Sequence, residues 1–321
     1  MGILDTIGKT EVINLEKSGS KLGLNLYAKL EFLNPGGSIK DRTSVSILQH
    51  ALKEGCLNPN STVIESSSGN MAVGLAQFCL YHKINLIIVV DPFALSSNVQ
   101  LIKTYGAKVI TIDTPCPVTG WLGARIKKIH ELHHVIPDAF WPNQYENTKN
   151  PDAHYHTMKE FNESLDQPLD YLFISTSTCG TLMGCSQYIN EHLLPTKIVA
   201  VDAVGSVIFS SKSGKRKIPG HGASRPSRLL DKTKVHHVIH VADLDCVEGC
   251  HRLLQEEAIL AGGSTGGVYH AISKFSAQLP PMSRCGMMVC DRGERYMETI
   301  YNQEWVERNL RSTVQNIEYA A

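Results

Sequence analysis

The sequence lacks any apolar run long enough to cross a membrane and any surplus of charge of one sign. The run Leu86 to Val90 is far shorter than the roughly 20 residues that span a bilayer. Lysine and arginine together number 31, as do aspartate and glutamate, so the formal net charge is zero, whereas nucleic-acid binders are usually basic. A content of 42% hydrophobic residues excludes a disordered chain. We therefore predict a folded protein with no membrane and no nucleic-acid partner.

The nine cysteines form no Cys-x-x-Cys pair, which favours reduced thiols over a disulfide framework or a zinc site. The opening residues, MGILDTIGKT, have neither the basic start nor the apolar run of a secretory signal, so we expect a cytoplasmic protein. Three histidine groups have no carboxylate or cysteine at metal-ligand spacing, and they predict polar loop and helix residues rather than a metal site. These groups are His133-His134, His154-x-His156 and His236-His237.

Apolar runs of strand length alternate with amphipathic runs of helix length along almost the whole chain. Strands are predicted at residues 24–30, 63–65, 86–91, 108–112, 171–175, 198–202, 236–241 and 287–290. Helices are predicted at residues 44–54, 72–82, 97–105, 121–133, 182–192, 243–260 and 267–278. This alternation indicates an α/β fold, in which mostly parallel twisted sheets are flanked by helices on both faces.

The length of 321 residues suggests two domains or one large α/β unit. Residues 140–151, FWPNQYENTKNP, are polar and rich in turn formers, and they separate predicted lobes 1–145 and 146–321. A second irregular segment, Ser210 to Pro226, is basic and rich in glycine and serine, and we interpret it as a mobile loop near a site. Its Lys-Arg-Lys run is more typical of a solvated loop than of a nucleic-acid patch.

The segment Asn34 to Arg42, NPGGSIKDR, is a glycine-bearing turn between a predicted strand and a helix. Parallel sheets place their ligand crevices at such junctions. Burial and neighbouring cations lower the pKa of a lysine from about 10.4 and free its amine to attack a carbonyl, so Lys40 is a candidate nucleophile. The alternative is a helix-entry turn whose Lys40 is simply exposed.

A second turn, Glu65 to Met71 (ESSSGNM), places hydroxyls, Gly69 and an amide before a helix. Unpaired N–H groups and the helix dipole at this position favour a carboxylate. Taken alone, the same residues could be a helix N-cap.

A third turn, Ser177 to Gly184 (STCGTLMG), follows a strand and opens a helix. Backbone amides in such a turn can surround a phosphate without any lysine, which suits a permanently held cofactor phosphate. The turn is not a Walker A loop, because no Gly-Lys-Ser/Thr follows, and it is not a Rossmann fingerprint.

Together with a fourth turn, Ala261 to Gly267 (AGGSTGG), these segments resemble the β-family, or fold type II, of pyridoxal-phosphate enzymes. Cysteine synthases and cystathionine β-synthases belong to that family. The resemblance covers about Leu4 to Tyr301. It implies a two-lobed fold similar to that of the tryptophan synthase β-subunit, a homodimer, and pyridoxal 5′-phosphate as the cofactor. It also implies that a smaller part, about residues 43–141, closes on the substrate.

The resemblance also implies roles for particular residues. Lys40 would form the Schiff base with the cofactor, Asn70 would hydrogen-bond the ring hydroxyl of the cofactor, and Ser264 would face the pyridine nitrogen. The cofactor phosphate would be bound by Ser177, Thr178, Cys179, Gly180 and Thr181. The substrate carboxylate would be held by Ser67, Ser68 and Gln144, with Gly69 and Met71 in the same substrate loop.

A serine opposite the pyridine nitrogen has a consequence for the reaction. Unlike an aspartate, the Ser264 hydroxyl cannot hold that nitrogen protonated, so the ring would be a weaker electron sink. Loss of a β-substituent is then favoured over transamination. The reaction class implied is β-replacement, in which the amine of Lys40 removes the α-proton and a nucleophile takes the place of the leaving group.

Several segments depart from the pattern of ordinary cysteine synthases, namely Val90-Asp91-Pro92, Met71, Gln144-Tyr145, Ser224-Arg225 and Asp291 to Tyr296 (DRGERY). Of these, Arg225 carries the most weight in the prediction. A guanidinium beside the leaving group favours a phosphate over a neutral acetyl ester, so O-phospho-L-serine is the predicted donor.

The combination VDP, NQY, VDAVGSVIF, GASR, AGGSTGG and DRGERY is similar to one group within the family. These are the synthases of N-(2-amino-2-carboxyethyl)-L-glutamate, which join O-phosphoserine to the amine of L-glutamate on the route to 2,3-diaminopropionate and siderophores. By this resemblance Arg125 and Tyr145 would handle glutamate, although a surface position on a helix explains Arg125 equally well. The nearest alternative is a cysteine synthase that uses O-phosphoserine or O-acetylserine with sulfide. A non-catalytic member would lack the lysine or the phosphate loop, and both are present.

Overall fold

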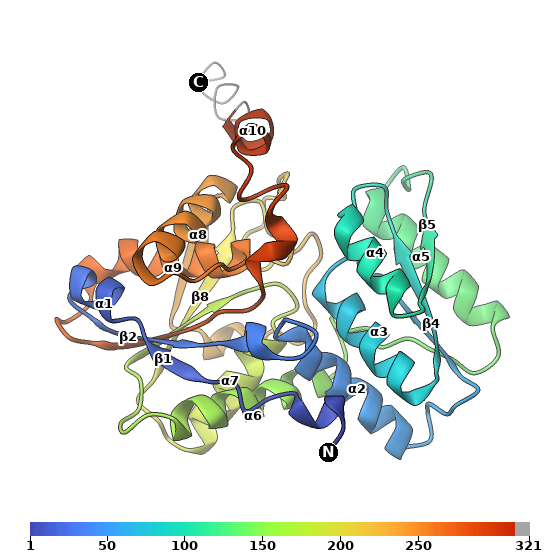
Figure 1. The fold of residues 1–321 in the computed structure, drawn as a ribbon, viewed down its shortest axis with the longest axis horizontal. Coiled ribbons are helices and arrows are strands. Elements are labelled where there is room, and N and C mark those ends of the chain that lie inside the picture. Colours follow the sequence, from blue (N-terminus) through green and yellow to red (C-terminus); the bar gives the residue numbers. More distant parts are fainter. Residues whose placement is uncertain (312–321) are drawn as a thin grey trace.

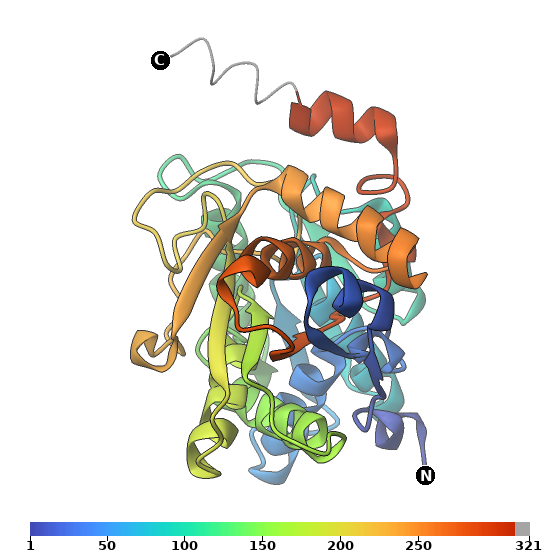
Figure 2. The same ribbon diagram turned by 90° about the vertical axis from the view of Figure 1, so that its left-hand side faces the viewer.

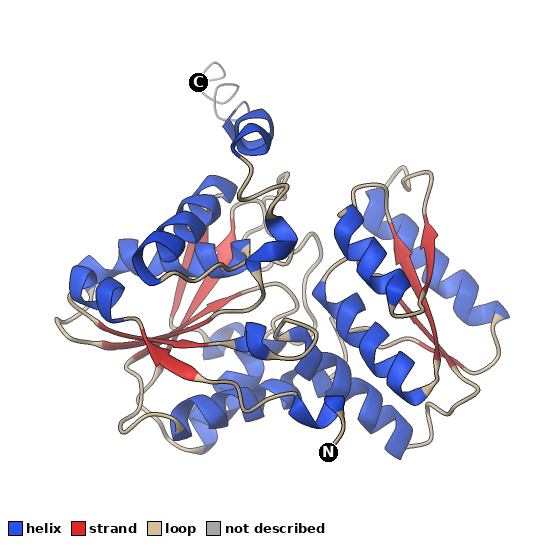
Figure 3. Cartoon of the chain, in the orientation of Figure 1, coloured by secondary structure: helices blue, strands red, loops and turns tan. Residues whose placement is uncertain are grey.

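The computed structural model describes residues 1–311 of the chain. Helices and strands alternate around two sheets (Figures 1 and 3). The larger sheet has six strands in the order β1-β2-β10-β7-β8-β9, and the smaller has four in the order β5-β4-β3-β6. Within residues 1–311 every strand pair is parallel except β1 with β2. The predicted α/β fold with mostly parallel sheets is therefore confirmed.

The larger sheet contains β1 (Val12–Asn14), β2 (Asn25–Lys29), β7 (Tyr171–Ser175), β8 (Lys197–Ala203), β9 (His237–Val241) and β10 (Arg284–Met288). The smaller sheet contains β3 (Thr62–Glu65), β4 (Asn85–Val90), β5 (Lys108–Thr111) and β6 (Ala139–Phe140). The α-helices are α1 (Glu16–Leu22), α2 (Lys40–Lys53), α3 (Asn70–His82), α4 (Ser96–Thr104), α5 (Gly120–Val135), α6 (Lys149–Glu163), α7 (Gly180–Glu191), α8 (Asp243–Glu257), α9 (Gly263–Phe275) and α10 (Gln303–Val306).

Helices cover both faces of the larger sheet (Figures 1 and 2). Alternate side chains of β8 pack on opposite faces, as the two-residue period of a strand requires. Val199 and Val201 belong to the core under α8 and α9, whereas Ile198 and Ala200 belong to the core over α6 and α7. Burial on both faces explains why these strands are continuous apolar runs.

The smaller sheet is covered in the same way. In β4, Leu86, Ile88 and Val90 pack in the core formed with α2, α3 and α4. Ile87 and Val89 point to the other face, where the core includes Ile129 of α5. The apolar run of β4 is thus a fully buried strand. Among residues 1–311, no helix combines the length and the apolar character needed to cross a membrane.

The structure contains elements that the sequence pattern does not indicate. The short strands β1 and β6 and the helices α1 and α6 were not predicted, and β10 begins and ends earlier than expected. Residues 140–151, expected to be irregular, include the first turn of α6. The strands β1 and β2 pair within the larger sheet, so the two sheets do not correspond to the two halves of the sequence. The division at residue 145 and the closure of the smaller part stay predictions.

Candidate active site

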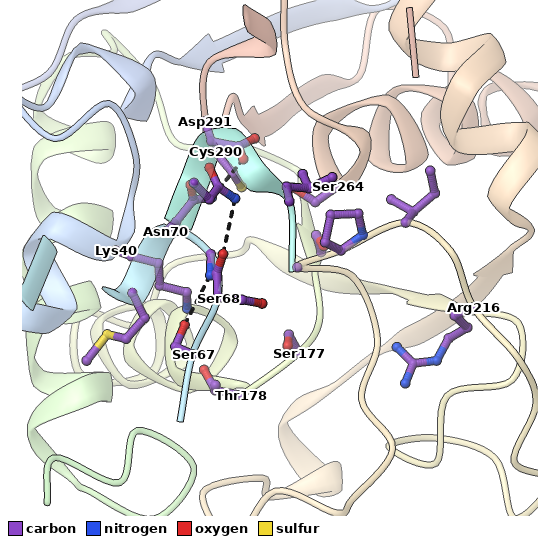
Figure 4. Close-up of a pocket in the computed structure, with 18 of the residues that line it drawn as sticks. Lys40, Ser67, Ser68, Asn70, Ser177, Thr178, Arg216, Ser264, Cys290 and Asp291 are labelled. Atoms are coloured by element: carbon purple, nitrogen blue, oxygen red, sulfur yellow. Dashed lines mark hydrogen bonds between the residues drawn. The ribbon is translucent and has the colours of Figure 1, made fainter. Parts of the chain in front are cut away.

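A cavity of about 910 Å³ lies where loops from the two sheets meet. Its walls include the loop after β3, the loop after β7 and the start of α2 (Figure 4). Both loops follow the carboxyl ends of parallel strands, which is where α/β folds place their ligands. The fold therefore brings three of the glycine-bearing turns, at residues 34–42, 65–71 and 177–184, together at this cavity.

The predicted site residues line this cavity with one exception. Those at its wall are Lys40, Ser67, Ser68, Gly69, Asn70, Met71, Arg125, Gln144, Tyr145, Ser177, Thr178, Cys179, Gly180, Thr181 and Ser264. The exception is Arg225, whose guanidinium carbon lies 4.1 Å from the centre of the Tyr145 ring. Its nitrogen also donates a hydrogen bond of 3.4 Å to Asn143 Oδ1. Arg225 therefore supports Tyr145, and Arg216 is the arginine of this loop that reaches the cavity wall.

Lys40 is the first residue of α2, and it lines the cavity. Burial lowers the pKa of Lys40, although the neighbouring thiols of Cys290 and Cys179 oppose the shift. A lower pKa leaves more of the amine unprotonated at neutral pH. Lys40 therefore has the property required of a nucleophile that attacks a carbonyl.

A buried ion-pair network fixes the helix that carries Lys40. Arg42 donates to both carboxylate oxygens of Glu31, at 2.7 and 2.8 Å, and to Glu160 of α6 at 2.6 and 2.8 Å. Hydrogen bonds and the charge of Arg42 outweigh the effect of burial and lower the pKa of Glu160 to about 2. Breaking such a buried pair on one side is costly. The start of α2 is thus held firmly against the larger sheet.

The loop after β7 forms a cradle of backbone amides at the start of α7. Cys179, the N-cap residue, has a left-handed conformation with φ of 64°. The first N–H groups of a helix have no partner inside the helix, so those of α7 are available to an anion. Thr178 is held in place because Asn150 donates to its hydroxyl at 3.1 Å and Ser227 donates to its carbonyl at 2.6 Å. This arrangement fits a phosphate group.

The loop after β3 forms a second polar wall at the start of α3. The Gly69 amide donates weakly to Ser67 Oγ at 3.4 Å, and Asn98 donates to the Ser68 carbonyl at 3.2 Å. Ser66 Oγ and Gln144 Oε1 are buried without a hydrogen-bond partner. Polar atoms left unpaired in this way are expected where a ligand completes the hydrogen bonding.

The smaller sheet supplies the wall facing these turns. Arg125 of α5 lies 3.4 Å from Asp91, measured between Nε and Oδ2. The rings of Phe93 and Trp121 contact each other edge to face, with centroids 5.6 Å apart. All of these residues line the cavity. Arg125 is therefore a residue of the cavity wall, and its role with glutamate stays a prediction.

The residues present fit pyridoxal 5′-phosphate. The cavity offers a buried amine at Lys40, an amide cradle at residues 177–181 and a neutral hydroxyl at Ser264. Ser264 is largely buried at the start of α9. The amine can bind the aldehyde carbon, the cradle can bind the phosphate, and a hydroxyl can hydrogen-bond a pyridine nitrogen without protonating it.

The chain belongs to the family of pyridoxal-phosphate dependent enzymes, whose model matches residues 3–291. A structure of an O-acetylserine dependent cystathionine β-synthase from Helicobacter pylori is 29% identical, with a TM-score of 0.87. The similarity covers 94% of this chain and 99% of that one. A structure of O-ureido-L-serine synthase is 25% identical, with a TM-score of 0.87, and covers 96% and 95% of the two chains.

A third structure, of a hydrogen sulfide-producing enzyme from Fusobacterium nucleatum, is 30% identical, with a TM-score of 0.85. It is matched over 92% of this chain and 99% of that one. The expected family and cofactor are therefore confirmed.

A histidine and two carboxylates lie together where α8 contacts α9, outside the cavity. His270 Nε2 is 3.3 Å from Asp245 Oδ1, and Nδ1 is 3.5 Å from Glu248 Oε2. The two ring nitrogens face different carboxylates. No single ring nitrogen is therefore placed to bind a metal ion together with both carboxylates. Lys274 also supplies a positive charge 4.0 Å from Asp245. Burial lowers the pKa of His270 and favours its neutral form, so we interpret Lys274 and Asp245 as the charged pair of this group.

Some cavity residues were not assigned from the sequence. Arg216, with Lys215 and Lys217, belongs to the basic loop expected near a site, but Arg225 was the residue of that loop predicted to contact the substrate. Asp91 and Asp291 were noted only as departures from a family pattern. Their position after a strand or beside a glycine turn is the signal that could have identified them.

Proposed function

We propose that this pyridoxal-phosphate enzyme condenses O-phospho-L-serine with L-glutamate by β-replacement. The bond from Cβ to the phosphate oxygen breaks, and phosphate leaves with the electron pair. A bond forms between Cβ and the glutamate nitrogen, which releases a proton. The product is N-(2-amino-2-carboxyethyl)-L-glutamate, a precursor of 2,3-diaminopropionate and of a siderophore.

The observation that carries this proposal is the cationic wall of the cavity. Lys215, Arg216 and Lys217 line it from the basic loop, and Arg125 lines it from α5. Phosphoserine carries a phosphate and a carboxylate, and glutamate carries two carboxylates. Cations at the wall attract such anions and can hydrogen-bond to them. An acetyl ester carries no charge to pair with these cations, and sulfide lacks the two carboxylates of glutamate.

The relatives support the reaction class. One is described as O-acetylserine dependent and another as an O-ureido-L-serine synthase. Both descriptions name a serine derivative substituted at the β-position. Replacement at Cβ of a serine derivative is the reaction that we propose here.

When bound, the cofactor supplies an electron-accepting ring that stabilises negative charge at Cα of the donor. The buried amine of Lys40 would accept the Cα proton and return it to Cα after the new bond to nitrogen has formed. Ser67 and Ser68 orient the donor carboxylate at the start of α3. Ser264 leaves the ring neutral, which favours departure of phosphate. Tyr145, supported by Arg225, and Arg125 position glutamate.

A cysteine synthase that uses sulfide is the second candidate. It is favoured by the likeness to a hydrogen sulfide-producing enzyme at 30% identity. Assembly as a homodimer, closure of the smaller part over the substrate and a cytoplasmic location complete the main proposal.

The test is an assay of purified holoenzyme with O-phosphoserine and either glutamate or sulfide. We expect phosphate release with glutamate and, by mass spectrometry, a product of the mass of the condensed amino acids. Phosphate release with sulfide alone, together with cysteine formation, would instead establish the second candidate. Glutamine is the matched acceptor control, because it keeps the amine and removes the side-chain charge.

A further inference from the structure

The side-chain amide of Asn70 is hydrogen-bonded at both its nitrogen and its oxygen by the segment that follows β10. Asn70 Nδ2 donates a hydrogen bond of 2.7 Å to Asp291 Oδ2. Arg295 donates to Asn70 Oδ1. Asn70 is the first residue of α3, on the smaller sheet, whereas Asp291 and Arg295 follow a strand of the larger one. The contact therefore joins the two parts of the molecule across the cavity (Figure 4).

These partners determine which way the amide points. The guanidinium of Arg295 only donates hydrogen bonds, so the group facing it must be the amide oxygen of Asn70. The amide nitrogen then faces Asp291, whose carboxylate accepts. The side-chain nitrogen carries two protons, and Asp291 takes one of them. The other is the donor that Asn70 can offer to a group in the cavity or to the hydroxyl of Tyr296, which also interacts with this amide.

Further hydrogen bonds fix the positions of Asp291 and Arg295. Tyr296 donates its hydroxyl proton to Asp291 Oδ2, the oxygen that also accepts from Asn70. The other terminal nitrogen of Arg295 donates a hydrogen bond to the carbonyl of Gly36, in the turn before Lys40. Asp291 is 3% exposed, and it forms a backbone bridge with Ser38. The turn that carries Lys40 is therefore fixed together with Asn70.

We propose that Asp291 and Arg295 are positioning residues that set the amide of Asn70 as a hydrogen-bond donor toward the ring oxygen of the cofactor. The proposal rests on the role of Asn70 beside the cofactor ring, and it does not depend on the identity of donor or acceptor substrate. A flipped amide would present its oxygen to the ring oxygen and repel it. The two residues act through Asn70, and neither is required to contact the cofactor.

The test measures cofactor binding in Asp291→Asn, Asn70→Ala and the double variant. Pyridoxal 5′-phosphate is titrated into each apoprotein, and its affinity and visible absorption band are recorded. Asp291→Asn keeps the size of the side chain but no longer requires a donor opposite it. We expect the affinity to fall by about tenfold, the value of one hydrogen bond of roughly 1.4 kcal/mol, with a shift of the absorption band.

In the Asn70→Ala background we expect Asp291→Asn to cause no further change in affinity or band position. An equal loss in both backgrounds would mean that Asp291 acts independently of Asn70 and would overturn the proposal. So would Asn70→Ala or Asp291→Asn with unchanged affinity and spectrum. The matched control is Glu294→Gln, an exposed carboxylate in the same segment, which should bind the cofactor as the unmodified protein does.

Arg295→Lys keeps the test decisive if Asp291→Asn does not fold. A lysine retains the charge, but its single nitrogen cannot replace the guanidinium that bridges Asn70 and Gly36. We expect Arg295→Lys to weaken the affinity for the cofactor when Asn70 is present. When Asn70 is already alanine, we expect Arg295→Lys to leave that affinity unchanged. The thermal midpoint of each apoprotein separates loss of folding from loss of cofactor binding. Because the readout is cofactor binding, failure of the phosphoserine and glutamate assay leaves this test unaffected.

Discussion

Replacing Gly180 by alanine tests whether the amide cradle depends on close packing against α6. A Cβ atom built on Gly180 overlaps the Oδ1 and Cγ atoms of Asn150 and lies 2.6 Å from its Nδ2. Asn150 is fully buried. It donates to the Gln144 carbonyl at 2.7 Å and to Thr178 Oγ1 at 3.1 Å, and it accepts from Thr43 Oγ1 at 3.3 Å. The methyl group fits only if Asn150 moves.

The expected loss follows from these contacts. Each hydrogen bond of Asn150 is worth about 1 kcal/mol, and an added carbon in a packed core costs about 1–3 kcal/mol. If all three hydrogen bonds are lost, we expect Gly180→Ala to lower the free energy of unfolding by about 4–6 kcal/mol. Cofactor affinity should fall as well, because Asn150 holds Thr178 in the cradle.

Urea unfolding of the apoprotein measures the first effect, and titration with the cofactor measures the second. The control is Asn150→Ala, which removes the atoms that the methyl group meets. In that background Gly180→Ala should cost little, and the interaction energy of the cycle gives the size of the clash. A loss below about 1 kcal/mol for Gly180→Ala alone would refute the reasoning.

The remaining predictions concern catalysis and pH. Lys40→Ala should abolish the visible absorption band of the bound cofactor; a band unchanged in position would show that another group binds the cofactor. Arg216→Gln should reduce kcat/KM for O-phosphoserine by about 10- to 100-fold, the value of a charge-assisted hydrogen bond, and by much less for O-acetylserine. Arg225→Gln should have a smaller effect, because Arg225 packs on Tyr145 and does not line the cavity. If Arg216→Gln reduced kcat/KM equally for O-phosphoserine and O-acetylserine, the assignment of Arg216 would be contradicted. Burial lowers the pKa of His221 to about 4, so the unfolded chain binds a proton below about pH 6.5 that the folded chain does not. Stability should therefore fall as the pH drops from 6.5 to 4, and urea unfolding of His221→Gln should show a weaker dependence in that window.

The strands and most helices could be predicted because their side chains follow the two sheet faces or one helix face. The helix α6 could not, since its first turn contains Pro151 and its buried face includes polar residues. His154 hydrogen-bonds Thr157 and Thr43 there, so no apolar period marks the helix. The strand β6 spans only Ala139–Phe140, too short for any alternation to be visible.

The site could be predicted from its turns because a turn after a parallel strand is local in sequence. Contacts between turns are not local. The pairing of Arg225 with Tyr145 joins two loops, and the sequence alone gave no reason to place Arg216 rather than Arg225 at the wall. The hydrogen bonds of Asp291 and Arg295 with Asn70 likewise join residues more than two hundred positions apart. Such contacts are set by how the two sheets pack.

The most direct test of the proposed function is the fate of the glutamate nitrogen. Holoenzyme is incubated with O-phosphoserine and glutamate labelled with ¹⁵N at the amine, and the products are analysed by mass spectrometry. Our proposal predicts a single condensed amino acid that carries the label, with one phosphate released per molecule formed. Unlabelled products, or phosphate release that requires sulfide, would contradict it.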